Sequence, residues 1–243
     1  MSMIKDSTNF VSYIETRIQS NNTLYSRFHI GNFSSGQALT IANTLRRILL
    51  SQIPSFIISK VEIEGVRHEF DSILDIKENI LDVILNLKNL HVYSNKTDII
   101  NIQNQESIAS INFLGPGTIT AKDIQFPNGL VPVYLNSPIA TCSDNGHFSA
   151  RLFIKYIDPL IQMNQFESLQ RNQLLVTTSS QPIVQVNYTI KKTNLAGSEY
   201  ISLEIWSNGS VDPKLALQYT LEMCTRNFFN FTTLARKLTT PII

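Results

Sequence analysis

The chain has 243 residues, enough for one large domain or two modest ones, each able to bury a core. Hydrophobic residues make up 43% and charged residues 16%, which is typical of a folded rather than a disordered protein. With 20 basic and 19 acidic residues the net charge is +1, so bulk charge gives no support for a nucleic-acid or membrane-surface binder.

The first third of the chain predicts a hairpin, a helix and a strand. Residues 9–19 and 23–33 alternate apolar and polar side chains, which predicts a β-hairpin. Ser34-Ser35-Gly36 offers an N-cap region for a helix of roughly 37–52. Residues 57–63 are rich in β-branched side chains and predict a strand.

A second helix is predicted from Asp75 to about Leu90. Asp75, with Glu78 three residues later, resembles the start of a capping box. The apolar residues that follow recur at helical spacing: Ile76, Ile80, Val83, Ile84 and Leu87.

The middle of the chain, from 91 to about 160, predicts short strands broken by turns, the first at Gly115-Pro116-Gly117. Residues 158–182 are polar and weakly patterned, which predicts a long loop. Two strands are then predicted, over 183–191 and 200–207, with their turn at 194–198.

The last predicted element is a helix that opens at Asp212-Pro213, an N-cap followed by proline at the first helical position. It carries one apolar stripe: Leu217, Leu221, Cys224, Phe228 and Phe231. Either the stripe is core, or it packs against a second helix in a dimer. The pattern alone favours neither.

Side chains that could carry chemistry are sparse. Arg46-Arg47 indicates either a solvated helix face or a protein contact, because arginine is enriched at interface hot spots. His68-Glu69 lacks the second histidine of a metal site and the nucleophile of a catalytic one. Cys142 and Cys224 predict two thiols rather than a disulfide, and no zinc-binding spacing surrounds them.

A series of short motifs runs along nearly the whole chain: Gly36-Gln37, Asn43-x-Leu45-Arg46-Arg47-Ile48-Leu49-Leu50-Ser51, Val66-x-His68-Glu69-Phe70, Asn86-Leu87-Lys88, Thr120-Ala121-x-Asp123-Ile124, Pro182-Ile183-Val184, Asn187-Tyr188, Leu203-Glu204-Ile205-Trp206-Ser207-Asn208-Gly209-Ser210 and Pro213-Lys214-x-Ala216-Leu217. Taken together and in this order, the motifs resemble the alpha subunit of bacterial-type, multisubunit DNA-directed RNA polymerase, most closely the plastid-encoded form.

The resemblance implies an α+β fold in which both ends of the chain build one subdomain. Residues 1–54 plus 183–243 would form a dimerisation subdomain, and 55–182 an inserted β-rich subdomain. The family's small helical C-terminal DNA-binding domain is expected to be absent. DNA contact is therefore expected only indirectly, through the holoenzyme.

The resemblance also implies partners and contact residues. Two copies are expected to dimerise and to hold the polymerase β and β′ subunits. The implied β-subunit contacts are Arg47, Leu50 and Arg46, and the implied β′-subunit contacts are Lys88 and Val176. The implied dimer contacts are Leu39, Leu217, Leu221, Phe228 and Phe231.

The chain departs from the family pattern at several positions. Ala38 and Ala42 replace two usual glycines, and Asp75 stands where a glycine is common. Near the implied β′ contact the unusual residues are Thr177, Thr178 and Ser180.

No catalytic residue and no cofactor are expected in this chain, since the resemblance places the polymerase's Mg and Zn on β and β′. The chain would then be a non-catalytic subunit of a nucleotidyltransferase. No membrane segment or targeting leader is visible, and we expect a soluble protein of the plastid, with the bacterial cytoplasm as the lesser alternative. Two other functions stay open: a stand-alone homodimeric binding module, and an unrelated enzyme that uses His68 and Glu69.

Overall fold

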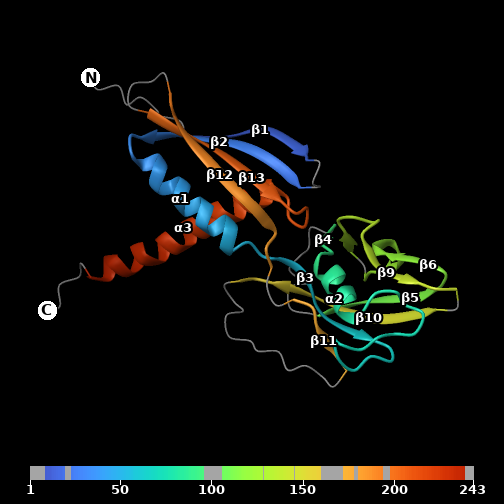
Figure 1. Ribbon diagram of the computed structural model, residues 1–243. Helices are drawn as coiled ribbons and strands as arrows, with labels where there is room; N and C mark the ends of the chain where they lie inside the picture. The colour runs from blue at the N-terminus through green and yellow to red at the C-terminus, as the bar shows by residue number, and fades with distance from the viewer. Residues whose placement is uncertain are drawn as a thin grey trace, which may run out of the picture. The chain divides into compact units, whose positions relative to one another are not determined.

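The computed structural model describes residues 9–19, 23–95, 106–127, 129–144, 146–159, 172–177, 180–193 and 198–238. The chain divides into two compact units (Figure 1). Unit 1 combines the two ends of the chain, Met1–Ile53 and Ile183–Ile243, and unit 2 is the segment Pro54–Pro182 between them. The expected α+β class is confirmed, and each unit has a hydrophobic core of its own.

Unit 1 is built on a four-stranded antiparallel sheet in the order β1-β2-β13-β12. The strands are β1 (Phe10–Ile18), β2 (Leu24–Ser34), β12 (Ile183–Lys192) and β13 (Ser198–Ser207). β1 and β2 form the predicted hairpin, and β12 and β13 confirm the two predicted C-terminal strands. β13 also pairs with β2, so strands from opposite ends of the chain lie side by side (Figure 1).

Two helices, α1 (Gln37–Ser51) and α3 (Pro213–Leu238), pack on this sheet (Figure 1). Because a helix turns once in about 3.6 residues, side chains spaced by four and three share one face. The buried face of α1 follows that spacing: Ala38, Ala42, Leu45 and Leu49. Ala38 and Ala42 are both 0% exposed, and their small side chains let α1 lie close to its neighbours.

The ends of these helices show which capping predictions hold. The α1 N-cap is Gly36, with a φ of 85° and no side-chain cap. The N-cap therefore lies within the predicted region Ser34-Ser35-Gly36, but neither serine caps the helix. The carboxylate of Glu199 accepts hydrogen bonds from Gly36 N (3.2 Å) and Ser35 Oγ (3.3 Å). At α3 the prediction is confirmed, since Asp212 Oδ1 accepts a hydrogen bond from Lys214 N at 2.9 Å.

Unit 2 is β-rich and antiparallel. Its main sheet has the order β11-β3-β10-β5-β7, and two short ribbons, β4-β8 and β6-β9, accompany it. The main strands are β3 (Ser55–Ile63), β5 (Ser107–Leu114), β7 (Ile124–Gln125), β10 (His147–Ile157) and β11 (Leu174–Leu175). The ribbon strands are β4 (Val92–Ser94), β6 (Gly117–Thr120), β8 (Leu130–Pro132) and β9 (Pro138–Cys142). The helix α2 (Ile80–Lys88) contributes Ile80, Val83, Ile84 and Leu87 to the core.

The predicted start of α2 is wrong. The helix begins at Ile80, with Asn79 as its N-cap. Asp75 has a φ of 67°, in the left-handed region that glycine adopts most easily and that aspartate tolerates better than most residues. The positive φ gives a physical reason to expect glycine at this position, although aspartate occupies it. Glu78 does not cap the helix; its carboxylate accepts hydrogen bonds from Thr141 N (2.6 Å) and Thr141 Oγ1 (2.9 Å).

The long loop predicted over 158–182 is also partly wrong, because it contains β11, which pairs with β3. Directly after β11, Val176 N donates a hydrogen bond to Ser59 O at 2.9 Å. The rest of the predicted loop, at 160–171 and 178–179, lies outside the described residues, as does most of the turn predicted at 194–198.

Leu152 of β10 lies in the core of unit 2 and is 0% exposed. We expect Leu152→Ala to lower the free energy of unfolding by about 2–5 kcal/mol, since the substitution removes buried methyl groups and leaves a cavity. Urea unfolding followed by circular dichroism measures the change. Leu114→Ala, at a 76% exposed leucine of the same unit, is the control and should change stability little.

The Glu78 contacts predict a pH dependence of stability. Burial, the largest single cause, raises the pKa of this carboxyl, but the hydrogen bonds from Thr141 and from the Glu78 backbone, together with the charge of Lys77, bring the net pKa below the ordinary 4.5. A carboxyl whose pKa is lowered on folding stabilises the fold above its unfolded pKa and loses that contribution as the pH falls through its folded pKa.

We therefore expect Glu78→Gln to be less stable than the wild type at pH 7. The difference should shrink as the pH falls below about 4.5. Urea midpoints at pH 7 and pH 3 measure it, and Glu106→Gln, at an exposed carboxylate, is the control. A difference that stays constant across this range would contradict the assigned role.

Candidate functional site

His68 and Glu69, the candidate acid–base pair, lie at the surface. His68 Nε2 lies 3.0 Å from Asp71 Oδ1, and the histidine side chain is 59% exposed. Glu69 is exposed as well. Acid–base catalysis requires the group to reach a bound substrate, whereas His68 contacts its own loop. Within the described ranges no group of three or more His, Cys, Asp and Glu residues could hold a metal ion.

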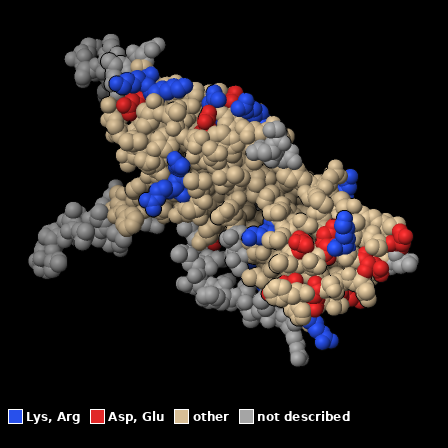
Figure 2. All heavy atoms as spheres, in the orientation of Figure 1, with Lys and Arg blue, Asp and Glu red and all other residues tan. Residues whose placement is uncertain are grey.

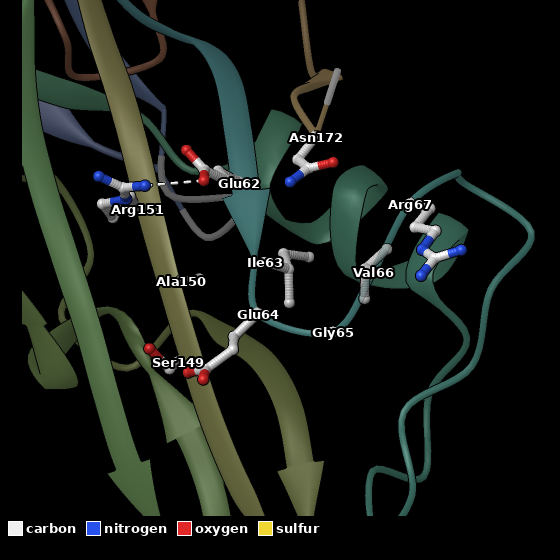
Figure 3. A pocket seen from close by; sticks show the side chains of 10 residues that line it. All are labelled: Glu62, Ile63, Glu64, Gly65, Val66, Arg67, Ser149, Ala150, Arg151 and Asn172. Atoms are coloured by element: carbon white, nitrogen blue, oxygen red, sulfur yellow. Dashed lines mark hydrogen bonds and ion pairs between the residues drawn. The ribbon is translucent and has the colours of Figure 1, made fainter. Parts of the chain in front are cut away.

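A pocket of about 450 Å³ lies next to this loop, between the end of β3 and β10 (Figure 3). Figure 3 shows Glu62 and Arg151 paired on one side of the pocket and Arg67 on the other. The Glu62–Arg151 distance is 2.7 Å, so these two charges already satisfy each other. Neither His68 nor Glu69 lines the pocket. The pocket is therefore a surface groove with a structural ion pair, Glu62–Arg151, on one of its sides.

The outward face of α1 carries four of the predicted contact residues. Leu39 is 50% exposed, Leu50 is 40% exposed, and Arg46 and Arg47 are exposed between them. At about 100° per residue, Leu39, Arg46 and Leu50 share one stripe of the helix and Arg47 lies beside it. Neither arginine forms an ion pair with any residue that the structure describes. A charged and aliphatic face is thus available to a partner.

The α3 stripe divides into two halves. Leu217 is buried in the core of unit 1, and Leu221 and Cys224 pack against that core while partly exposed. Phe228 and Phe231 are 66% and 70% exposed. The purely core interpretation therefore fails for the second half of the stripe. Because large apolar side chains in line on a helix are costly to leave in water, these two phenylalanines form a candidate interface.

The two predicted β′ contacts lie differently in unit 2. Lys88 is exposed in the last turn of α2, where a positive charge also favours the helix dipole. Val176 is only 7% exposed and belongs to the core. A partner at this segment would meet the 47% exposed Leu175 rather than the Val176 side chain. The Ser180 hydroxyl is hydrogen-bonded to Ser55, and Thr178 lies outside the described residues.

The sequence analysis missed an aromatic and charged cluster on the sheet of unit 1. Tyr25 is 1% exposed, its ring lies 5.0 Å from that of Trp206, and its hydroxyl donates to Glu204 Oε1 at 2.9 Å. Arg27 donates to the Tyr25 hydroxyl and pairs with Glu204 at 3.2 Å. Burial, the largest cause, raises the pKa of Tyr25. The cluster links β2 to β13. The alternation of side chains along each strand does not predict it, because the residues meet only through the register in which β2 pairs with β13.

Both cysteines are free thiols, as predicted. Burial raises the pKa of the Cys224 thiol, which keeps it protonated and unreactive at neutral pH. In the part of the chain that the structure describes, no helix has the length and hydropathy that crossing a bilayer requires.

Comparison with known proteins identifies the family of this chain. Residues 61–156 match the family described as the RNA polymerase Rpb3/RpoA insert domain. The DNA-directed RNA polymerase subunit alpha of Chlorella vulgaris is 34% identical over 97% of this chain and 99% of its own length.

Two further relatives carry the same name. The subunit from Synechocystis sp. is 30% identical over 90% of this chain and 69% of its own length. The subunit from Chlorokybus atmophyticus is 32% identical over 87% of this chain and 65% of its own length. This chain therefore belongs to the family of DNA-directed RNA polymerase alpha subunits.

Proposed function

We propose that this chain dimerises with a second copy of itself and holds the β and β′ subunits of a plastid RNA polymerase. The single observation that carries the proposal is the α3 stripe, which runs from the buried Leu217 to the exposed Phe228 and Phe231. Family membership supports the polymerase context. In this arrangement the chain brings the polymerase subunits together. The phosphodiester chemistry and its metal ions belong to the β and β′ subunits.

The dimer interface combines α3 with Leu39 in the first turn of α1, and the exposed residues nearer the other end of α1 are left to the β subunit. Leu221 extends the apolar stripe back towards the core of its own unit. Contact with the same stripe of a second copy would cover Phe228 and Phe231, which one chain alone leaves 66% and 70% exposed. An obligate interface of this kind buries on the order of 2,000 Å² or more.

The β subunit is proposed to bind the outward face of α1 through Arg47, Leu50 and Arg46. A planar guanidinium pairs with carboxylates through two hydrogen bonds, and an adjacent leucine supplies apolar area. Exposure of all three side chains supports this assignment.

The β′ subunit is proposed to bind unit 2 at Lys88 and at the segment that follows β11. The Val176 side chain anchors this segment from inside the core, while Leu175 faces outward. The 34% identity to the Chlorella vulgaris subunit supports a plastid location, with a bacterial cytoplasm as the lesser alternative.

Phe228→Asp is expected to convert the dimer into monomers, because the new carboxylate would be buried unpaired in an apolar interface. Sedimentation velocity at micromolar concentration measures the change. The control is Phe229→Asp, at a neighbouring phenylalanine that is 67% exposed but lies about 100° around the helix. If the Phe228→Asp chain were still dimeric, Phe228 would not lie in the dimer interface.

Arg47→Ala is expected to leave the dimer intact and to weaken capture of β by about 2 kcal/mol, a typical cost for truncating an interface hot spot. Pull-down with titrated β subunit measures it. Arg226→Ala, at an exposed arginine of α3, is the control. Unchanged β capture would contradict the assigned contact. If the wild-type chain dimerised but captured neither large subunit, it would be a stand-alone homodimeric module.

A further inference from the structure

The sheet of unit 1 has a second face, turned away from its core, that the assigned contacts do not use. Phe28 and Ile30 of β2 and Leu203 of β13 lie in the core shared with α1 and α3. Because successive side chains of a strand point to opposite faces, the residues between them point away from that core. On the outward face the register aligns residues of all strands in rows, and the row at one end is Phe10, Gly31, Tyr200 and Lys191.

This end of the outward face is aromatic. Gly31 has no side chain, and a Cβ there would lie 2.3 Å from the Phe10 ring, so this ring lies across β2 at the glycine. On the next strand, β13, the ring centre of Tyr200 lies 5.1 Å from that of His29. Phe10 is 40% exposed, and Tyr200 and His29 are partly exposed. Rings from three adjacent strands therefore meet the solvent together.

The rows of this face contain more basic than acidic side chains. Arg17, Arg27 and Lys191 stand against Glu15 and Glu204. Both carboxylates already pair with Arg27, at 3.3 and 3.2 Å. Figure 2 shows Lys and Arg side chains gathered along the upper edge of unit 1, over the strands of its sheet.

Arg17 and Lys191 are the cations that this face leaves available. Both are exposed, and neither forms an ion pair with any residue that the structure describes. The Arg17 guanidinium lies over the Tyr25 ring, 4.7 Å from its centre, in the row at the other end of the face. Burial, the largest cause, lowers the pKa of His29, and the charges of Lys191 and Arg27 lower it further. A positive potential therefore acts on the aromatic end.

The other side chains of this face are polar. The edge strand β12 exposes Gln185, Asn187 and Thr189, whose amides and hydroxyl can donate and accept hydrogen bonds. The described rows of the outward face contain no Val, Leu, Ile or Met. A protein interface usually has an apolar centre, which this face does not offer. Rings beside cations and polar side chains are instead how proteins bind single-stranded nucleic acids, whose bases stack and whose phosphates are negative.

We propose that the outward face of the unit 1 sheet binds single-stranded RNA, with bases stacked on Phe10 and Tyr200 and phosphates at Arg17 and Lys191. A duplex keeps its bases stacked inside, where these rings could not reach them. A DNA-directed RNA polymerase produces RNA as a single strand, so RNA rather than DNA is the expected ligand. The inference goes beyond the proposed assembly role. It is compatible with the net charge of +1, because the attraction is confined to one face.

The test titrates the full chain into a fluorescein-labelled single-stranded RNA of about 12 nucleotides and measures the dissociation constant by anisotropy at several salt concentrations. Phe10→Ala and Tyr200→Ala should each weaken binding by about tenfold, since each removes a ring on which a base stacks. Lys191→Gln and Arg17→Gln should each weaken binding and reduce the slope of log affinity against log salt by about 0.7, the value for one phosphate contact on a single strand.

The controls are residues of the same strands that point to the opposite face. Tyr13→Ala is the control for the rings, because the Tyr13 ring contacts Phe28 of the core face. Lys192→Gln removes the same charge as Lys191→Gln from the next position of β12. Both should bind RNA nearly as the wild type does. Circular dichroism checks folding, and the 40% exposed Phe10 keeps the test valid if Tyr200→Ala does not fold.

Further measurements separate RNA from other ligands. A photoreactive benzoylphenylalanine at position 10 should crosslink to the transcript in the assembled, transcribing polymerase. A crosslink to DNA or to protein only would overturn the inference. So would wild-type affinity for RNA in both ring variants. Displacement of the RNA by polyglutamate at an equal concentration of charges would assign the face to an acidic protein segment and would also overturn it.

Discussion

The pairing of β2 with β13 is the constraint on which unit 1 depends, because it joins two ends of the chain in one sheet. In its register Ile30 lies opposite Ile201, and Phe28 lies opposite Leu203. Ile201 and Leu203 are both 0% exposed. The same pairing sets Tyr25 beside Trp206 on the other face, where Glu204 and Arg27 close a hydrogen-bonded cluster. Both faces of the sheet therefore require one register.

Once the helices pack on this sheet, helical periodicity decides which side chains of each helix are buried in the core and which are exposed. Ala38, Ala42, Leu45 and Leu49 bind α1 to the core, so Arg46, Arg47 and Leu50 must face outward. On α3 the division runs along the helix axis. One face of its first turns is buried, including Ala216 and Leu217, and its apolar stripe then continues beyond the core to Phe228 and Phe231. The exposed faces that we propose as docking surfaces thus remain because the core of one chain does not cover them.

Elements with a regular pattern were predictable from the sequence, and elements set by single contacts were not. The hairpin, α1, the last two strands and the Asp212 cap follow from alternation, helical spacing and cap chemistry. The start of α2 was wrong because Glu78 binds Thr141, more than sixty residues away, rather than the helix end. β11 was missed because two residues carry no periodicity.

The insertion of unit 2 between α1 and β12 also affects the order in which the two units can fold during synthesis. During synthesis β2 emerges early, but its partner β13 follows only after the whole of Pro54–Pro182. Until Ser207 has left the ribosome, β2 has one edge of free backbone amides and carbonyls, which is a template for wrong pairing. Unit 2 has no such delay, since its strands lie within one continuous segment. We expect unit 2 to fold first, and unit 1 to be the slower and more aggregation-prone part.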